Sequence, residues 1–477
     1  MLLRGERLGE ISGDVLEFIS SREADRQIFE ADLLVDRAHL VMLKERGLIT
    51  AEEFSEIVAG LDGIEMVRLG EGEDVHEAIE AELIARVGAV GGRMHTGRSR
   101  NDEVATCIRI ALRGELLGLM AEVNDLAEAL VERAAENGDS IIPGFTHLQH
   151  AQPTTLAHYL LAHADALLRD FERLLDSYQR VNRSPLGAAA FASTGFDIDR
   201  ARTAELLAFD GLIENSMDAV STRDFLLEAL SSSAILMVNA SRLAEELILW
   251  STSEFGYLEL DDLFTSTSSI MPQKKNPDTA ELVRGKTGTV FGSLVAALTI
   301  NKALPMSYNR DLQEATPNLW RGISTTRAAV RILAGAVSSA KFNKERLEAA
   351  SGTGFSMATE IADSLVRKTK IPFRTAHQIV GALAAKGETP TIEDLDGAAE
   401  RIAGFRPSER GFGREELAAA LDPRRNVAAR SRTGGPAPAE TGRMAVDRRR
   451  RIEENERLVE EMRGRVDSAL AALREMR

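Results

Sequence analysis

Three apolar runs of helical periodicity, each longer than an ordinary globular helix, constrain the fold of this chain most strongly. They are "TTLAHYLLAHADALLRDFERLLDSYQRV" (154–181), "TRDFLLEALSSSAILMVNASRLAEELILW" (222–250) and "DTAELVRGKTGTVFGSLVAALTINKAL" (278–304). Apolar residues surround most of each run, as they do in a helix buried inside a bundle. Alternating strand-like segments are scarce. The sequence therefore predicts a mainly α protein built from a bundle of long helices.

Composition divides the 477 residues into three predicted domains. Residues 1–97 hold short helices with substrate-site segments, and 98–349 hold the long helices and a polar loop at 265–278. The predicted helices then shorten, and 350–477 is predicted to form a small C-terminal helical domain. Within that domain, 422–441 has the composition of an exposed loop.

The balance of charges and the single cysteine exclude several classes of function. Lysine and arginine number 58 against 74 acidic residues, and the net charge of −16 argues against a nucleic-acid-binding surface. Cys107 is the only cysteine, which excludes an internal disulfide and a multi-cysteine metal site. No stretch approaches the roughly 20 apolar residues of a membrane span. The N-terminus lacks the apolar core of a signal peptide, so the expected location is the cytoplasm.

The loop "TSTSSIMPQKKNPD" (265–278) concentrates groups that can carry chemistry. Five consecutive hydroxyl residues are followed by two lysines and an asparagine. Pro272 and Pro277 exclude a strand interior, because each removes a backbone donor, and they disfavour a continuous helix. The segment is therefore predicted to be a loop that presents hydroxyl, ammonium and carboxamide groups between two long helices.

Four further polar clusters lie far apart in the sequence, most of them beside long helices: "EDVHEAIE" with His76, "GGRMHTGRSRNDEVAT" (91–106), "PGFTHLQHAQPTT" (143–155) and "MSYNRDLQEATPNLW" (306–320). Arginines beside the amide donors of a helix start favour carboxylate or phosphate binding, although an ordinary N-cap by Ser99 or Asn101 explains 91–106 equally well. The paired histidines of 143–155 have no carboxylate at a recognisable ligand spacing, so no metal is expected.

The chemistry of these clusters favours acid–base catalysis on a polyanionic substrate. Removing a proton next to a carboxylate creates a doubly negative aci-carboxylate, which an ammonium and a carboxamide can stabilise as the charge develops. A serine can act as the base where cationic and amide groups stabilise its alkoxide. The ends of long helices in one chain are too distant to meet easily, whereas bundled copies bring different ends together. We therefore expect a site shared between subunits.

The motifs resemble those of the fumarase/aspartase superfamily, and of its argininosuccinate lyases in particular. "SSIMPQKKNPD" (268–278) is similar to the superfamily loop Gly-Ser-Ser-x-x-Met-Pro-x-Lys-x-Asn. "HTGRSRND" (95–102), "FTHLQHAQP" (145–153) and "YNRDLQE" (308–314) are similar to segments of argininosuccinate lyases. Fumarases and aspartases carry Gly-Lys-Val-Asn in the loop and adenylosuccinate lyases His-Lys-Arg-Asn, and neither fits as well.

The resemblance implies a reaction, an assembly and a set of site residues. It implies the reversible elimination of fumarate from argininosuccinate, the last step of arginine biosynthesis, without a cofactor. It also implies a homotetramer with a twenty-helix core and active sites shared by three subunits. Ser268 would be the base, and Lys274 and Asn276 would hold the aci-carboxylate. His147, oriented by Glu281, would bind substrate or supply the acid. The residues implied to line the substrate site are Ser21, Asp25, His76, Ser99, Arg100, Asn101, Thr146, Tyr308 and Gln313.

Two positions depart from the family pattern. Thr267 replaces the glycine before the two serines, which predicts a stiffer loop, and Thr316 stands where a substrate-binding lysine is expected. Arg310 or another arginine is the candidate to replace that lysine. The departures leave open a sister fumarate-releasing lyase of the adenylosuccinate lyase or aspartase type. A non-catalytic role, such as that of a lens crystallin with this fold, is disfavoured because the implied catalytic residues are present.

Overall fold

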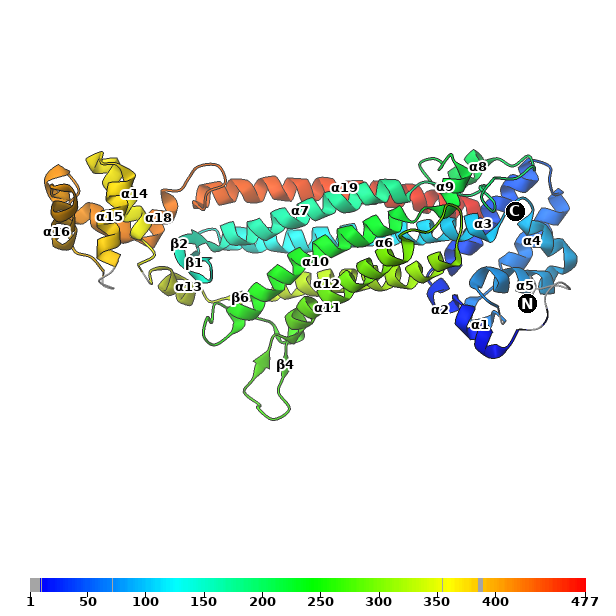
Figure 1. Ribbon diagram of the computed structural model, residues 1–477, viewed down its shortest axis with the longest axis horizontal. Coiled ribbons are helices and arrows are strands. Elements are labelled where there is room, and N and C mark those ends of the chain that lie inside the picture. Colours follow the sequence, from blue (N-terminus) through cyan, green and yellow to red (C-terminus); the bar gives the residue numbers. More distant parts are fainter. Residues whose placement is uncertain (1–8, 10, 71, 354, 385–388) are drawn as a thin grey trace.

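The computed structural model describes residue 9 and residues 11–70, 72–353, 355–384 and 389–477. The described part is largely helical and its strands are short, so the predicted mainly α fold is confirmed. The molecule is an elongated rod with a smaller group of helices at each end (Figure 1). None of the described helices is long and apolar enough to cross a membrane. Residues 1–8, on which the expectation of no signal peptide rests, lie outside the described part.

Long helices that run side by side form the rod (Figure 1): α6 (Arg100–Glu136), α7 (Leu156–Val181), α10 (Asp224–Ser251), α11 (Asp278–Asn301), α12 (Ala315–Ser339) and α19 (Pro438–Glu475). Helix α6 packs against α7, α12 and α19, and α10 packs against α7, α11 and α12. Leu112, Leu116 and Leu119 recur at helical spacing on α6 and are fully buried. Burying such a side chain contributes roughly 1.5–3 kcal/mol, so packing between these helices is the main source of stability in the rod.

One end of the rod carries shorter helices: α1 (Gly13–Ile19), α2 (Arg22–Asp25), α3 (Phe29–Glu45), α4 (Ala51–Leu61), η1 (Met66–Arg68), α5 (Val75–Val87) and η2 (Gly88–His95). Helix α3 packs on α6 and joins this end to the rod. Helix α4 begins at a capping box formed by Thr50 and Glu53, which satisfies amides that have no partner inside the helix. Between α7 and α10 the chain forms α8 (Arg200–Leu206) and α9 (Ser216–Ser221) near the same end (Figure 1).

The opposite end carries a small group of helices: α13 (Lys344–Ser351), α14 (Ala358–Thr369), α15 (Phe373–Ala384), α16 (Ile392–Ala403), η5 (Pro407–Arg410), α17 (Arg414–Leu421) and α18 (Pro423–Ala428). Residues from Ile361 to Ala420 form a hydrophobic core of their own. The expected exposed loop at 422–441 is wrong in part, because α18 and the start of α19 lie within it. Asp422 caps α18 by accepting the amides of Arg424 and Arg425, which its sequence position before Pro423 favours.

Helix α19 returns along the whole rod from the small C-terminal group (Figure 1). Ile452, Val459 and Leu473 are buried in the core of the rod, and α19 packs against α3, α6 and α7. The division into 1–97, 98–349 and 350–477 stays a proposal, and this packing argues for ending the small domain before Pro438. The sequence alone could not assign α19 to the rod, because its sparse apolar stripe fits any groove of similar shape.

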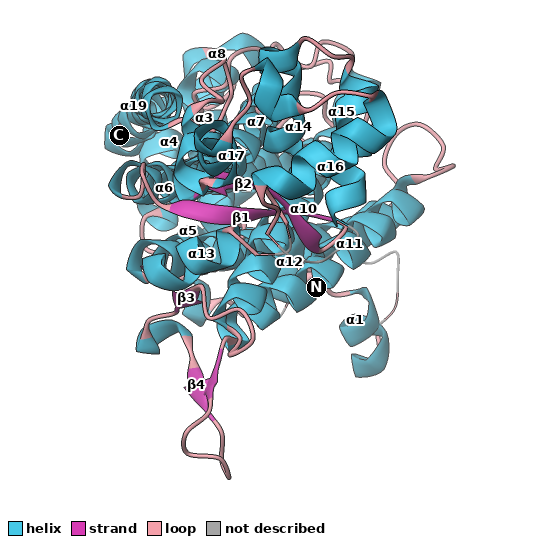
Figure 2. Cartoon of the chain, turned by 90° about the vertical axis from the view of Figure 1, so that its left-hand side faces the viewer, coloured by secondary structure: helices cyan, strands magenta, loops and turns pink. Residues whose placement is uncertain are grey.

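The described residues also form three pairs of short antiparallel strands: β1 (Ile141–Thr146) with β2 (Gln149–Thr155), β3 (Leu258–Glu259) with β6 (Lys341–Phe342), and β4 (Ser266–Thr267) with β5 (Lys275–Asn276). The β4–β5 hairpin projects away from the helices (Figure 2). It falls within the segment predicted to be a loop, and residues 268–274 at its tip are irregular. Pro272 lies at that tip and Pro277 follows β5, so neither proline interrupts the short ladder. The remaining 3₁₀ turns are η3 (Asp262–Phe264) and η4 (Arg310–Glu314).

Candidate active site

A cavity of about 550 Å³ opens where the N-terminal helices meet the rod. Its wall combines α2, the start of α5, the start of α6, η4 and the start of α12. Seven of the expected substrate-site residues line this one cavity: Ser21, Asp25, His76, Arg100, Asn101, Tyr308 and Gln313. The chain thus brings together segments that are up to about 290 residues apart in sequence.

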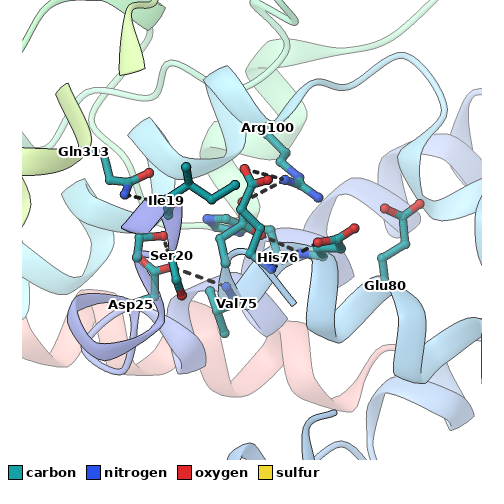
Figure 3. A network of polar contacts seen from close by, with 12 residues as sticks. Ile19, Ser20, Asp25, Val75, His76, Glu80, Arg100 and Gln313 are labelled. Atoms are coloured by element: carbon teal, nitrogen blue, oxygen red, sulfur yellow. Dashed lines mark hydrogen bonds and ion pairs between the residues drawn. The ribbon is translucent and has the colours of Figure 1, made fainter. Parts of the chain in front are cut away.

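Ser21 and Asp25 line the cavity at the two ends of the short helix α2. The Ser21 hydroxyl donates to Asp25 Oδ2 at 2.6 Å, and the Val75 amide donates to the same oxygen at 3.3 Å (Figure 3). The Ser21 amide in turn donates to the Glu73 carbonyl at 3.1 Å. Burial raises the pKa of Asp25, although His76 and these hydrogen bonds oppose that shift. The result is a fixed carboxyl group at the base of the cavity.

His76 lies on the first turn of α5, where a buried carboxylate holds its ring. Its Nδ1 lies 2.9 Å from Asp32 Oδ2, and both side chains are almost fully buried. Burial alone would lower the pKa of His76, but the Asp32 carboxylate raises it well above the ordinary value. The paired carboxylate thus favours the protonated form of the imidazole. Its Nε2 has no hydrogen-bond partner among the described residues, and His76 lines the cavity.

A buried ion network lies behind His76. The Arg98 guanidinium is 2.6 Å from Asp36 and 2.9 Å from Glu103. Burial raises the pKa of Asp36 to about 6, and the Arg98 charge opposes this shift. Oxygens of Asp32, Asp36 and Glu103 lie within 4.8 Å of one another, a spacing that could hold a metal ion. Because Arg98 already supplies the positive charge at this point, we describe the cluster as an ion network that fixes the His76 environment.

The start of α6 uses its polar residues in two ways. Ser99 is an ordinary N-cap: its hydroxyl accepts the Asn101 amide at 3.3 Å, and its own amide donates to Asp102 at 3.0 Å. Ser99 does not line the cavity, whereas Arg100 and Asn101 do. The Arg100 guanidinium donates to Asp74 at 2.8 Å, and the side-chain carboxamide of Asn101 donates to the Ala190 carbonyl at 3.0 Å. The N-cap prediction is thus confirmed for Ser99, and anion binding by Arg100 and Asn101 stays a prediction.

The residues of η4 and the segment before it close the far side of the cavity. Gln313 donates to the Ile19 carbonyl at 3.1 Å (Figure 3), and Arg310 donates to the same oxygen at 2.8 Å. Arg310 also pairs with Glu73 at 2.6 Å. Burial raises the pKa of the Tyr308 hydroxyl, and nearby guanidinium groups oppose that shift. Thr316 is buried and lines the cavity with its short neutral side chain.

The expected base and its helpers lie on the β4–β5 hairpin, outside this cavity. The Ser268 hydroxyl oxygen accepts the amides of Ile270 at 3.3 Å and Met271 at 3.1 Å. Lys274 is exposed and has no ion pair among the described residues, whereas its neighbour Lys275 pairs with Glu259 at 3.0 Å. Asn276 is half-buried in β5. The hairpin therefore combines an amide-stabilised hydroxyl with a free ammonium group.

His147 and Thr146 lie at the tip of the β1–β2 hairpin and are exposed. His147 and Leu148 form its two-residue turn with φ of 56° and 58°, a left-handed backbone that non-glycine residues adopt at a cost of roughly 1–2 kcal/mol each. Glu281, on the first turn of α11, is near Arg284 at 3.8 Å. Within the described part of one chain, no contact joins His147 to Glu281, so the expected pair is not formed there.

Sequence reasoning missed several residues of the cavity wall. Behind the wall, Asp32 pairs with His76 and Arg98 pairs with Asp36, and Arg223 lines the wall itself. Asp32 lies in a helix with no distinguishing motif, and Arg223 is a lone arginine before a long apolar helix. The signal that marks these residues is the cost of burying a charge, and the sequence does not show which charges are buried.

Comparison with known proteins shows similarity along the whole chain. A family of proteins described as "Lyase" matches residues 25–292, and one described as "Argininosuccinate lyase C-terminal" matches residues 355–428. The argininosuccinate lyase of Methanothrix thermoacetophila is 64% identical over 480 residues, covering 100% of this chain and 98% of its own. That of Methanosarcina acetivorans is 55% identical over 482 residues, with the same coverage.

Solved structures of related proteins share the fold. The crystal structure of EDDS lyase in complex with formate superimposes with a TM-score of 0.88 at 34% identity, covering 98% of this chain and 95% of the other. The 3-carboxy-cis,cis-muconate lactonizing enzyme from Pseudomonas putida superimposes with a TM-score of 0.74 over 92% of this chain. At 20% identity, the latter likeness concerns the fold alone.

Proposed function

The chain belongs to the argininosuccinate lyase family, and on this premise we propose that it releases fumarate from argininosuccinate and leaves arginine. The observation that carries this conclusion is the 64% identity with a curated argininosuccinate lyase over the full chain. The enzyme is a carbon–nitrogen lyase. The roles of individual residues and the assembly, proposed below, rest on the local geometry.

The first chemical step is removal of a proton from the carbon next to a succinate carboxylate. We assign the base to Ser268, because two backbone amides donate to its oxygen and would stabilise an alkoxide. The proton moves to the Ser268 oxygen, and the electron pair of the broken carbon–hydrogen bond forms the aci-carboxylate. Lys274 and Asn276, on the same hairpin, would hold that doubly negative group. The resemblance gave the same assignments, and the two amide donors are independent support for Ser268.

The second step breaks the carbon–nitrogen bond. The electron pair of the aci-carboxylate forms the double bond of fumarate, and the departing guanidino nitrogen takes a proton from an acid. His147, on its exposed turn, is the candidate for that acid or for a substrate contact. Glu281 of a different copy would orient it, since the two do not meet within one chain.

The cavity binds the substrate before these steps. The His76 Nε2 has no hydrogen-bond partner among the described residues, the Asp32 carboxylate favours the protonated ring, and Arg100 adds a guanidinium group. A substrate carboxylate would supply the missing acceptor, since a buried charged donor left without one is costly. Asn101, Tyr308, Gln313 and the Ser21–Asp25 pair would complete the binding site, with Ser99 holding the start of α6 in place. Thr146 would reach it from the hairpin of another copy, together with His147.

We propose a homotetramer whose active sites are each shared by three subunits. The outward face of α11 supports this assembly: Leu282 and Val295 are about 60% exposed (59% and 61%), which is unusual for apolar residues on a long helix. Gly285, Gly288 and Gly292 continue the same face and have open space beside them, which allows another helix to approach closely. Such contacts would bring the Ser268 hairpin and the His147 turn of other copies to each cavity.

The test of the function is the appearance of the ultraviolet absorbance of fumarate after argininosuccinate is added to purified protein. Adenylosuccinate, aspartate and malate are run beside it, because relatives of this fold act on different substrates. We expect fumarate from argininosuccinate alone. Fumarate from adenylosuccinate or aspartate, with none from argininosuccinate, would replace this proposal by a sister lyase.

A further inference from the structure

Asp102 is a buried carboxylate that the reaction steps above do not use. It lies in the first turn of α6, directly after Asn101, and is 0% exposed. Its Oδ1 accepts the Ser99 amide at 3.0 Å, and its Oδ2 accepts the amides of Gly187 at 2.9 Å and Ala189 at 2.8 Å. The contact with Ser99 belongs to the cap of α6. The two contacts of Oδ2 join the helix to residues 85 and 87 positions further along the chain, so this side chain does more than start a helix.

The adjacent carboxylate shows that compensation of charge alone does not explain this arrangement. Glu103 is also buried, and it pairs with the Arg98 guanidinium at 2.9 Å. Asp102 has no ion pair among the described residues and is satisfied by backbone amides instead. A guanidinium on a long side chain compensates a charge without fixing a loop. Hydrogen bonds from backbone amides, in contrast, fix the segment that carries those amides.

The backbone of residues 187–193 has a shape that needs such an anchor. Gly187, Ala189 and Ser193 have φ of 86°, 52° and 61°. Residues other than glycine seldom adopt this left-handed region. A Cβ at Gly187 would lie 2.5 Å from Cγ of Arg200, which favours glycine there. Backbone amides that converge on one point form a concave anion site, and here the anion is a side chain of the same protein.

The anchored segment reaches the substrate cavity through Asn101. The Ala190 carbonyl, directly after the second anchored residue, accepts a hydrogen bond from the Asn101 carboxamide at 3.0 Å. This contact uses one of the two N–H groups of the carboxamide. Asn101 lines the cavity, whereas Asp102 and Ala190 do not. Asp102 thus holds in place the acceptor that sets the orientation of a cavity residue.

We propose that Asp102 is a positioning residue for Asn101. It fastens residues 187–189 to the start of α6 and so keeps the Ala190 carbonyl where it orients the Asn101 carboxamide for the substrate. Asp102 itself neither touches substrate nor takes part in the proton transfers. The proposal rests on the proposed function in one respect, which is that Asn101 contacts argininosuccinate.

A double-mutant cycle separates this role from a purely structural one. Asn101→Ala removes the substrate contact, and the KM for argininosuccinate should rise about tenfold. Asp102→Asn keeps the shape of the side chain but replaces one acceptor oxygen, and the KM should rise about fivefold with a smaller change in kcat. The assays are run at pH 8, because burial raises the pKa of Asp102 to about 6.

The double variant decides between the two roles. Its KM should equal that of Asn101→Ala within about twofold, because Asp102 acts through a side chain that is no longer present. If the two effects multiply to about fiftyfold instead, Asp102 acts on the site independently of Asn101, and the proposal is wrong. An unchanged KM in Asp102→Asn alone would also overturn it.

Asp199→Asn is the matched control, on the same connection between α7 and α8. Asp199 accepts the Arg202 amide at 2.9 Å as the N-cap of α8, and asparagine caps a helix about as well as aspartate. The same chemical change at this position should leave the KM unchanged. A rise as large as that in Asp102→Asn would assign the effect to the loss of a charge near the site and overturn the proposal.

Hydrogen exchange in the wild-type enzyme tests the anchor without a substitution. The amides of Gly187 and Ala189 should exchange slowly although they belong to no helix or strand, because each donates to a buried carboxylate. In Asp102→Asn, a peptide covering 186–190 should exchange at least about tenfold faster, while one from the middle of α6 is unchanged. Rapid exchange of this peptide in the wild type would overturn the proposal, even if the variants fail to fold. Failure of the fumarate assay would refute the function, and the exchange rates would still decide whether Asp102 anchors the segment.

Discussion

The cavity wall and the two exposed hairpins hold their functional residues in opposite ways. On the wall, Asp25 and His76 are buried and already receive hydrogen bonds or ion pairs from their own chain. On the hairpins, Lys274 and His147 are exposed, and Leu148 beside His147 is 76% exposed. With the roles proposed above, one chain builds the binding half of the site and leaves the reactive residues on exposed hairpins.

The difference has a physical cause. Buried charges must be paired or hydrogen-bonded within the fold that buries them, so the recognition groups are arranged by a single chain. Some groups act on a substrate bound by another subunit or close over that substrate. A short stiff segment is enough to position such groups. If this division is right, variants at the hairpins should affect turnover and variants at the wall should affect binding or stability.

The largest effect is expected from Ser268→Ala. Loss of the base should lower kcat more than about a hundredfold, because a positioned base contributes roughly 10²–10⁴ to the rate. The measurement is fumarate release under saturating argininosuccinate, with light scattering to show that the assembly is intact. Ser266→Ala is the matched control, since Ser266 is an exposed serine of the same hairpin, in β4. A near-normal rate in Ser268→Ala would remove serine from the base role.

A substitution on the outward face of α11 tests the assembly itself. Gly288→Leu meets no atom of its own chain within 4 Å of the added Cβ, so the single chain should fold. The side chain should nevertheless obstruct the proposed helix contacts, dissociate the tetramer and lower activity at least about tenfold, since the sites would lack their second half. Gly397→Leu, on an exposed helix of the small domain with equally open space, should change neither property. A fully active tetramer carrying Gly288→Leu would show that this face is not an interface.

Mixing two inactive variants tests whether the halves come from different copies. Tetramers of His147→Ala and of Ser268→Ala are dissociated, combined in equal amounts and reassembled. If each site takes these residues from different subunits, about a quarter of the sites should regain both, with activity to match. The separately reassembled variants are the control. No recovery in the mixture would count against the shared-site arrangement.

The smallest effect is expected at His39, which lies under the buried network of the cavity end. Burial lowers the pKa of His39 to about 3, with the Arg98 charge adding to the shift, and its Nε2 lies 2.8 Å from the Thr96 carbonyl. The folded protein thus keeps this imidazole neutral, while the unfolded chain binds a proton below about pH 6.5. The unfolding free energy should therefore fall as the pH drops from 6.5 toward 3, by about 2 kcal/mol at pH 5.

His39→Gln keeps a donor for Thr96 and removes that titration. Urea denaturation at pH 7.5 and pH 5.0 should show a smaller loss of stability in the variant than in the wild type. His150→Gln, on the exposed β1–β2 hairpin, should retain the wild-type difference. An unchanged pH dependence in His39→Gln would mean that other groups govern acid stability at this end.

The sequence was informative where a local pattern has one physical interpretation. The long apolar runs had to be buried helices, and Ser99 was one of two N-cap candidates for α6, which its capping box with Asp102 confirms. The polar loop at 265–278 was recognised by composition, although its short β4–β5 ladder was not. Two residues of pairing on each strand produce no hydrophobic alternation that could reveal a strand.

Other features had no local signature. Helix α18 was missed because an Asp-Pro pair starts a turn or a short helix equally well. The place of α19 depended on which groove remained after the rod had assembled. Arg223 and Asp32 gained their significance only from their neighbours, since any arginine or aspartate is unremarkable until burial removes its water.

The sequence by itself determined the helical periodicity, the polar clusters and the family resemblance, because these depend on the order of residues along the chain. Tertiary structure alone decided that seven of the implied residues share one cavity while Ser268, Lys274 and His147 lie outside it. It also decided which charges are compensated. Desolvation and pairing are properties of packed neighbours, and residues far apart in sequence become neighbours only in the folded chain.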